Sequence, residues 1–150
     1  MREILFRGKR TDNGNWIDGH LIVYPKSKRT KIMVWEQADL EFNAIEVRPE
    51  TVGQYTGLTD KNGTKIFEGD ILRYVYEPGK GYWNCYQNGV VKWREPGWYM
   101  EGIKGTNKYA LMSGYLSTIP YATIGNEQKN IQVFEVIGNI HDNLELLEVE

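Results

Sequence analysis

The segment from Asp60 to Leu72 reads DKNGTKIFEGDIL, and its order of turns and apolar residues is the most informative pattern in the chain. Its first part, Asp60 to Lys65, is a strong turn signal, because an aspartate accepts backbone N–H groups and Asn62-Gly63 can supply a left-handed φ. Glu68-Gly69-Asp70 makes a second tight turn, with Gly69 as the residue of unusual φ. The clearest strand of the chain, Ile71 to Tyr76, follows directly. Two turns so close to an apolar strand predict a β fold.

The residues on both sides of this segment extend the same pattern. Five Trp, ten Tyr and sixteen Gly in 150 residues favour pleated, half-buried surfaces joined by turns. Short apolar and aromatic runs recur with Gly, Asn or Pro between them, as in the meander of a small barrel or sandwich. A turn is expected at Asn88-Gly89, and one helical turn at Asn143 to Leu147 with Asp142 or Asn143 as its N-cap. The predicted strands are Glu3–Lys9, Trp16–Tyr24, Thr30–Trp35, Phe42–Val47, Ile71–Tyr76, Val90–Trp93, Trp98–Glu101 and Ile131–Ile140.

The length of the chain fits one domain, or two small subdomains that share a core. We predict a single domain over residues 1–150, all β with minor helix. Within it, residues 1–50 would form an N-terminal β subdomain and residues 51–150 the main barrel.

Composition excludes several classes of protein. No apolar run approaches the ~20 residues that span a bilayer, and the N-terminus lacks the apolar stretch of a secretory signal, so we expect no membrane partner. A net charge of −2 and a pI of about 5.8 argue against a strongly basic nucleic-acid binder, while leaving room for a local basic patch. Cys85 is the only cysteine, so no internal disulfide can form, which fits a cytoplasmic location.

The chemistry-bearing residues form no convincing catalytic or metal motif. The stretch Asp60-Lys61-Asn62-Gly63 resembles a calcium loop, but its glycine stands fourth rather than sixth, so we expect no metal and no cofactor. Glu68 and Asp70 flank one glycine, and turn chemistry with solvent exposure explains them better than a catalytic pair. His20 and His141 could each serve a His/carboxylate enzyme site, which is the weakest of the functional hypotheses.

Aromatic and basic residues offer a second hypothesis, an interaction surface. An exposed aromatic strip on a small barrel can stack nucleobases, grip a peptide or form a subunit interface, although about half of these aromatics should lie in the core. Tyr99 belongs to the same aromatic set. Basic residues beside Pro25 could add a phosphate-binding loop. The predicted interaction surface comprises Tyr82, Trp83, Tyr86, Trp93, Trp98, Lys28 and Arg29.

Several segments, in this order, resemble the YopX family of bacteriophage and prophage proteins. The likeness begins at Arg2 to Lys9, continues through Trp16 to Gly19, is most specific from Thr51 to Ile71, and closes with Val136 to Asn143. It leaves a variable middle over residues 77–130. The structural motif that it marks consists of Gly53, Tyr55, Gly57, Asp60, Gly63, Phe67, Glu68, Gly69, Asp70, Gly138 and Asn139.

The resemblance implies a mainly β fold with an SH3-like barrel, self-association and no catalytic residues. Fold alone does not settle function, because small barrels host many functions. The leading hypothesis is therefore a non-enzymatic phage accessory protein that acts through binding and assembles as a homo-oligomer. The alternative is a nucleic-acid-binding small β-barrel.

Overall fold

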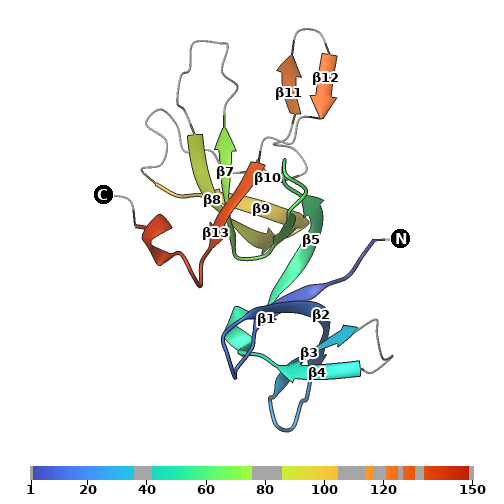
Figure 1. The fold of residues 1–150 in the computed structure, drawn as a ribbon. Helices are drawn as coiled ribbons and strands as arrows, with labels where there is room; N and C mark the ends of the chain where they lie inside the picture. Colours follow the sequence, from blue (N-terminus) through green and yellow to red (C-terminus); the bar gives the residue numbers. More distant parts are fainter. Residues whose placement is uncertain are drawn as a thin grey trace. The chain divides into compact units, whose positions relative to one another are not determined.

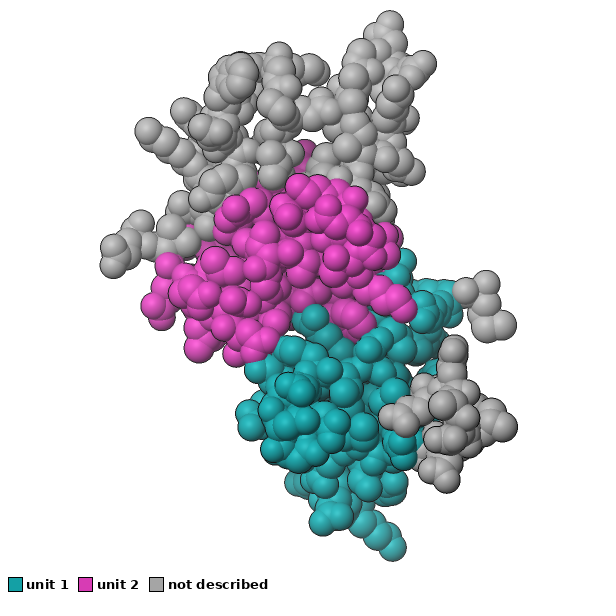
Figure 2. Space-filling view, in the orientation of Figure 1, with its two compact units in different colours: residues 1–57 teal, residues 58–150 magenta. Residues whose placement is uncertain are grey.

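The fold is nearly all β, as the sequence predicts (Figure 1). The computed structural model describes residues 2–35, 42–75, 86–104, 114–116, 121–124, 127–130 and 134–148. Two short 3-10 helices are the only helices within these ranges. The chain divides into two compact units, Met1–Gly57 and Leu58–Glu150, which Figure 2 shows in teal and magenta. The division falls inside one strand, between Gly57 and Leu58.

Unit 1 contributes the strands β4-β3-β2-β1-β5 to a six-stranded antiparallel sheet, in which β6 (Lys65–Phe67) follows β5. The connection between β1 and β2 contains Gly14 at φ +72°, a conformation that suits a tight turn. A 3-10 helix, η1 (Pro49–Thr51), leads into the last strand. The strands are β1 (Phe6–Lys9), β2 (Trp16–Val23), β3 (Thr30–Trp35), β4 (Phe42–Glu46) and β5 (Gly53–Thr59).

Unit 2 is built on a five-stranded antiparallel sheet with the order β10-β9-β8-β7-β13. In Figure 1 these strands form its curved centre. The elements of unit 2 are β6 (Lys65–Phe67), β7 (Asp70–Val75), β8 (Tyr86–Arg94), β9 (Gly97–Gly102), β10 (Gly114–Tyr115), β11 (Tyr121–Ile124), β12 (Glu127–Asn130), β13 (Phe134–Asn139) and η2 (Leu144–Leu146).

The two edge strands of this sheet show whether it closes into the predicted barrel. Strands β10 and β13 are its outer members and do not pair with each other within the described residues, so the sheet is not a closed barrel. In the described part of the chain, strands β11 and β12 pair only with each other. The all-β class is confirmed, and the architecture is two open antiparallel sheets together with the separate pair β11–β12.

The core of unit 2 joins the predicted turn segment to the meander. Ile66 and Leu72 come from either side of the Glu68–Asp70 turn, and both are almost fully buried. They pack with residues of β8, β9 and β13, which explains why the turns must hold their geometry. The full cluster is Ile66, Leu72, Tyr74, Val91, Trp98, Met100, Leu116 and Phe134.

The predicted turn at Asn88-Gly89 is wrong, because β8 runs without a break through both residues. A Cβ on Gly89 would lie 2.4 Å from the Cγ atom of Met100 on β9, so the glycine makes room for a core side chain. Asn88 is buried and accepts a hydrogen bond from Arg73 Nε at 3.1 Å. Cross-strand packing here overrides a local turn preference.

The C-terminal helical turn exists in a shorter form. It is the 3-10 helix η2, and Asn143 occupies the N-cap position without a side-chain capping bond. Asn143 Oδ1 instead accepts the backbone N–H of Asn139 at 3.2 Å. The side chain therefore ties the turn back to β13 rather than capping the helix.

Candidate functional site

Asp60 is a structural carboxylate at the end of β5. Its Oδ1 accepts the backbone N–H groups of Asn62 at 2.8 Å and Thr64 at 2.9 Å, and its Oδ2 accepts that of Val136 at 3.0 Å. Burial of the carboxylate, only 1% exposed, raises its pKa, but the hydrogen bonds from Val136, Thr64 and Asn62 outweigh burial and leave the pKa below its ordinary value. The predicted acceptance of backbone N–H groups is confirmed.

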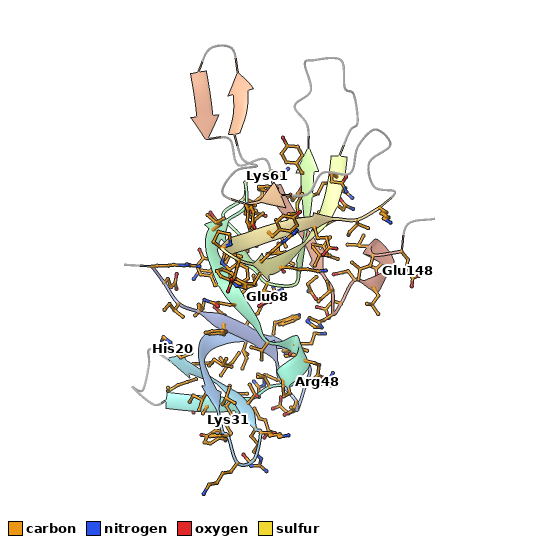
Figure 3. The ribbon with its side chains drawn as sticks, turned by 180° about the vertical axis from the view of Figure 1, so that it is seen from behind. His20, Lys31, Arg48, Lys61, Glu68 and Glu148 are labelled. Carbon is orange, nitrogen blue, oxygen red and sulfur yellow. The ribbon has the colours of Figure 1, made fainter. Side chains whose placement is uncertain are left out.

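Hydrogen bonds to backbone groups also hold the turn at Glu68-Gly69-Asp70. Gly69 has φ +84°, as predicted, donates its N–H to Val91 O and accepts the N–H of Ile140, both at 2.9 Å. Asp70 Oδ2 accepts the N–H of Phe67 at 2.8 Å. The expectation that Asp70 faces solvent is wrong, since the residue is 1% exposed. Glu68, marked in Figure 3, is half-buried at the same turn.

Asn139 organises the turn after β13 in a similar way. Its Oδ1 accepts the backbone N–H groups of His141 at 2.9 Å and Asp142 at 3.0 Å, and its Nδ2 donates to Asp142 Oδ2 at 3.0 Å. These bonds close the loop on itself. The most specific polar residues of the motif thus serve backbone geometry.

Of the remaining motif positions, Gly138 lies in β13, and the others lie along β5, the following turn and β6. Gly53 and Tyr55 are buried in β5, and Phe67 is buried in β6. Gly57 and Gly63 are exposed and have φ +84° and +82°.

The two histidines lie in different units. His20, labelled in Figure 3, is exposed on β2, whereas His141 is half-buried in the turn after β13. Nowhere in the described ranges do three or more His, Cys, Asp or Glu side chains gather as a metal site would require.

The predicted aromatic surface splits between core and solvent. Trp98 is buried and Trp93 is half-exposed, and their rings meet edge to face with centroids 5.1 Å apart. Tyr82, Trp83 and the side chain of Tyr86 lie outside the described residues. Lys28 and Arg29 are exposed in the turn between β2 and β3, well away in sequence from the aromatic strands.

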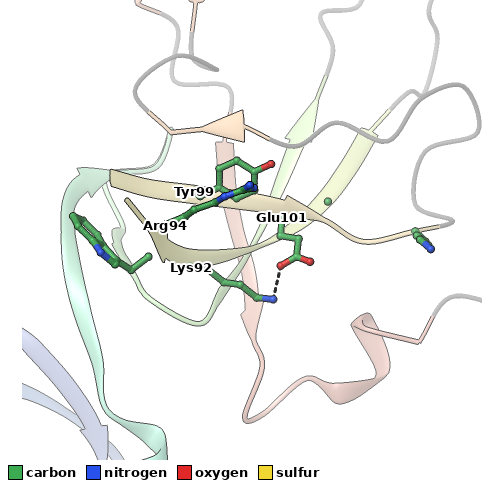
Figure 4. A pocket seen from close by; sticks show the side chains of 7 residues that line it. Lys92, Arg94, Tyr99 and Glu101 are labelled. Atoms are coloured by element: carbon green, nitrogen blue, oxygen red, sulfur yellow. Dashed lines mark hydrogen bonds and ion pairs between the residues drawn. The ribbon is translucent and has the colours of Figure 1, made fainter. Parts of the chain in front are cut away.

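A groove lies on one face of the β8–β9 hairpin (Figure 4), and we call it the hairpin groove. Its volume is about 570 Å³. The register pairs Lys92 with Tyr99 and Val90 with Glu101, and side chains alternate along a strand, so Lys92, Tyr99 and Glu101 project from one face. The lining residues are Lys92, Trp93, Arg94, Tyr99, Glu101, Gly102 and Lys104.

Charged and aromatic side chains within the hairpin groove hold one another in place through direct contacts. Lys92 Nζ forms an ion pair with Glu101, and this hydrogen-bonded lysine lowers the pKa of the Glu101 carboxyl. The Arg94 guanidinium lies over the Tyr99 ring, 4.9 Å from its centroid. Tyr115 on β10 meets Tyr99 edge to face at 5.3 Å and donates its hydroxyl to Glu95 O at 2.8 Å.

Sequence reasoning missed the charged members of this groove. Lys92 and Glu101 belong to two predicted strands, and Arg94 directly follows the first of them. Their alternation with Val91, Trp93 and Met100 was a usable signal for one shared face. The partnership of the two strands and the placement of Lys104 beside them required the tertiary register.

The fold and this groove together define an all-β protein of two units with a basic, aromatic surface. The family model described as YopX protein matches residues 5–148, so the chain belongs to the YopX family. The family predicted from the sequence motifs is therefore confirmed.

Two further comparisons complete this placement. The crystal structure of protein EF1440 from Enterococcus faecalis is similar, with a TM-score of 0.50 and 24% sequence identity over 99% of this chain and 100% of that one. A likeness at this identity shows a shared fold alone. No curated protein matches the sequence. In the described part of the chain, no helix has the length and apolar character needed to cross a membrane.

Proposed function

We propose that the protein is a non-enzymatic accessory protein of a phage or prophage, which works in the bacterial cytoplasm by binding a partner through the hairpin groove. One contrast carries this proposal. The two aspartates of the family motif, Asp60 and Asp70, are buried and bonded to backbone N–H groups, whereas the charged and aromatic side chains of the hairpin groove face solvent. Groups held in backbone bonds stabilise turns, and groups gathered in a groove are available to a ligand.

Self-association is the second part of the proposal. Large apolar side chains that are more than half exposed support it in both units, because burying apolar area drives association. Sedimentation velocity over a concentration series should show a concentration-dependent oligomer. A monomer at every concentration would remove the assembly part and leave the binding part standing. The side chains concerned are Ile4, Val23 and Leu144.

Site-specific photo-crosslinking tests the binding surface. A benzophenone amino acid replaces Tyr99 in the groove or, as a control outside the groove, Asn62, which is exposed in the turn after β5 of the same unit. In the phage-bearing host, we expect a discrete adduct from position 99 and none from position 62. Treatment of the adduct with nuclease or protease then identifies its class. Equal adducts at both positions, or none at position 99, would contradict the groove as the binding surface.

A further inference from the structure

We infer that the hairpin groove binds single-stranded nucleic acid, an inference that rests on the proposed binding function and names its ligand. The charges come first. Lys92, Arg94 and Lys104 line the groove together with one carboxylate, Glu101, so the lining carries two net positive charges on a chain whose total is −2. A concave surface with an excess of positive charge concentrates anionic ligands.

The geometry of Arg94 favours a ligand with planar rings. Its guanidinium lies on the Tyr99 ring at 4.9 Å, and Tyr115 braces that ring from its edge at 5.3 Å. A guanidinium plane held from one side offers its other side to a nucleobase. Lys92 and Lys104 are compact charges suited to the phosphates on either side of such a base.

A single strand fits these features better than other polyanions. The bases of a duplex are stacked on one another, so the Arg94 guanidinium would find no free base to stack on in a duplex. An acidic peptide would satisfy the lysines but leave the Arg94–Tyr99 stack unused. Unpaired bases and backbone phosphates satisfy both kinds of group, as on other single-strand surfaces.

Fluorescence anisotropy with the full chain tests the ligand class. The probes are a short labelled oligothymidylate, the same length of RNA, an abasic backbone of equal charge, a hairpin duplex and a polyglutamate peptide. We expect the oligothymidylate to bind at low salt and to lose roughly tenfold in affinity between about 50 and 200 mM salt, as for two or three phosphate contacts. The ratio of DNA to RNA affinity then distinguishes the two sources of single strands. No binding of either strand at low salt, or equal binding of the abasic backbone or of polyglutamate, would overturn the inference.

Two charge-matched double variants locate the site. Arg94→Gln with Lys104→Gln removes two cations from the groove, and Lys28→Gln with Arg29→Gln removes two from the β2–β3 turn in unit 1. We expect the first pair to weaken oligothymidylate binding by about tenfold or more and the second by less than about twofold. Greater loss from the Lys28 and Arg29 pair would overturn the assignment to the groove. Circular dichroism and thermal melting establish that both pairs are folded.

Arg94→Lys separates stacking from charge, because it keeps the cation and removes the planar group. We expect it to weaken oligothymidylate binding several-fold while leaving the abasic backbone unaffected. An equal effect on both probes would contradict base stacking at Arg94. A protein adduct from the photo-crosslinker at position 99, with no oligonucleotide binding, would sustain the proposed binding function and reject nucleic acid as the ligand.

Discussion

Asp60 accepts the backbone N–H of Val136 through its Oδ2 at 3.0 Å, although 76 residues separate the two in the sequence. The same carboxylate holds its own turn through Oδ1. One buried side chain thus joins the turn after β5 to strand β13. This hydrogen bond therefore connects the part of the family motif near residue 60 with its C-terminal part near residue 138.

Asp60→Asn should destabilise unit 2 at neutral pH by about 1–3 kcal/mol, because an amide has one acceptor oxygen and leaves one buried donor without a partner. Chemical denaturation measures this loss. The control is Asp12→Asn, at an exposed carboxylate paired with Arg10, which should change the free energy of unfolding by less than about 0.5 kcal/mol. Equal effects of the two substitutions would contradict the role given to Asp60.

The same carboxylate predicts an acid-dependent loss of stability. The pKa of Asp60 in the folded chain is below its ordinary value of 3.8, so as pH falls the unfolded chain takes up the proton first. The stabilisation is complete above the ordinary pKa and is lost as pH falls through the folded pKa. Denaturation curves from neutral pH to about pH 2 should therefore show the advantage of wild type over Asp60→Asn shrinking. A difference that is constant with pH would refute this linkage.

Gly69→Val should destabilise the protein more than Gly63→Val. Both glycines have positive φ, which costs other residues about 1–2 kcal/mol. A Cβ at Gly69 would also lie 3.5 Å from the Ile140 side chain, so the larger valine adds crowding, whereas nothing lies within 4 Å of a Cβ at Gly63. Thermal melts of the two variants provide the comparison. A Gly69→Val variant as stable as wild type would show that this turn tolerates other backbone geometries.

Gly138 and Asn143 should show strong energetic coupling. A Cβ on Gly138 would lie 2.4 Å from Asn143 Oδ1, the atom that accepts the Asn139 N–H. Gly138→Ala should therefore cost about 2 kcal/mol, and Asn143→Ala about 1 kcal/mol. The double variant should cost clearly less than their sum, because removing the asparagine side chain relieves the clash. Additive free energies of unfolding would mean that the clash is relieved elsewhere.

Glu101→Gln should leave stability within about 0.5 kcal/mol of wild type, because its ion pair with Lys92 is more than half exposed. Among the described residues that line the groove, Glu101 is the only carboxylate, so its removal should raise oligothymidylate affinity several-fold at low salt. Anisotropy titrations measure the gain. Glu135→Gln is the matched control, since it removes the same charge from the exposed Lys61–Glu135 pair outside the groove. An equal gain in the control would show that total charge, rather than the groove, sets affinity.

The turn chemistry of this protein was readable from residues close together in the chain. Asp60, Gly63 and Gly69 behave as their residue types predict, because an aspartate that accepts nearby N–H groups and a glycine at positive φ depend on local backbone geometry. The all-β class follows from the short apolar runs that turn residues separate. The YopX family follows from the order of the motifs.

The features that depend on strand register could be seen only in the tertiary structure. Asp70 is buried rather than exposed, and Asn88-Gly89 continues a strand rather than turning, because neighbouring strands surround both sites. The hairpin groove likewise exists only because the β8–β9 register sets Lys92 beside Tyr99. Local sequence determines where a chain can turn, whereas long-range pairing determines which side chains then meet.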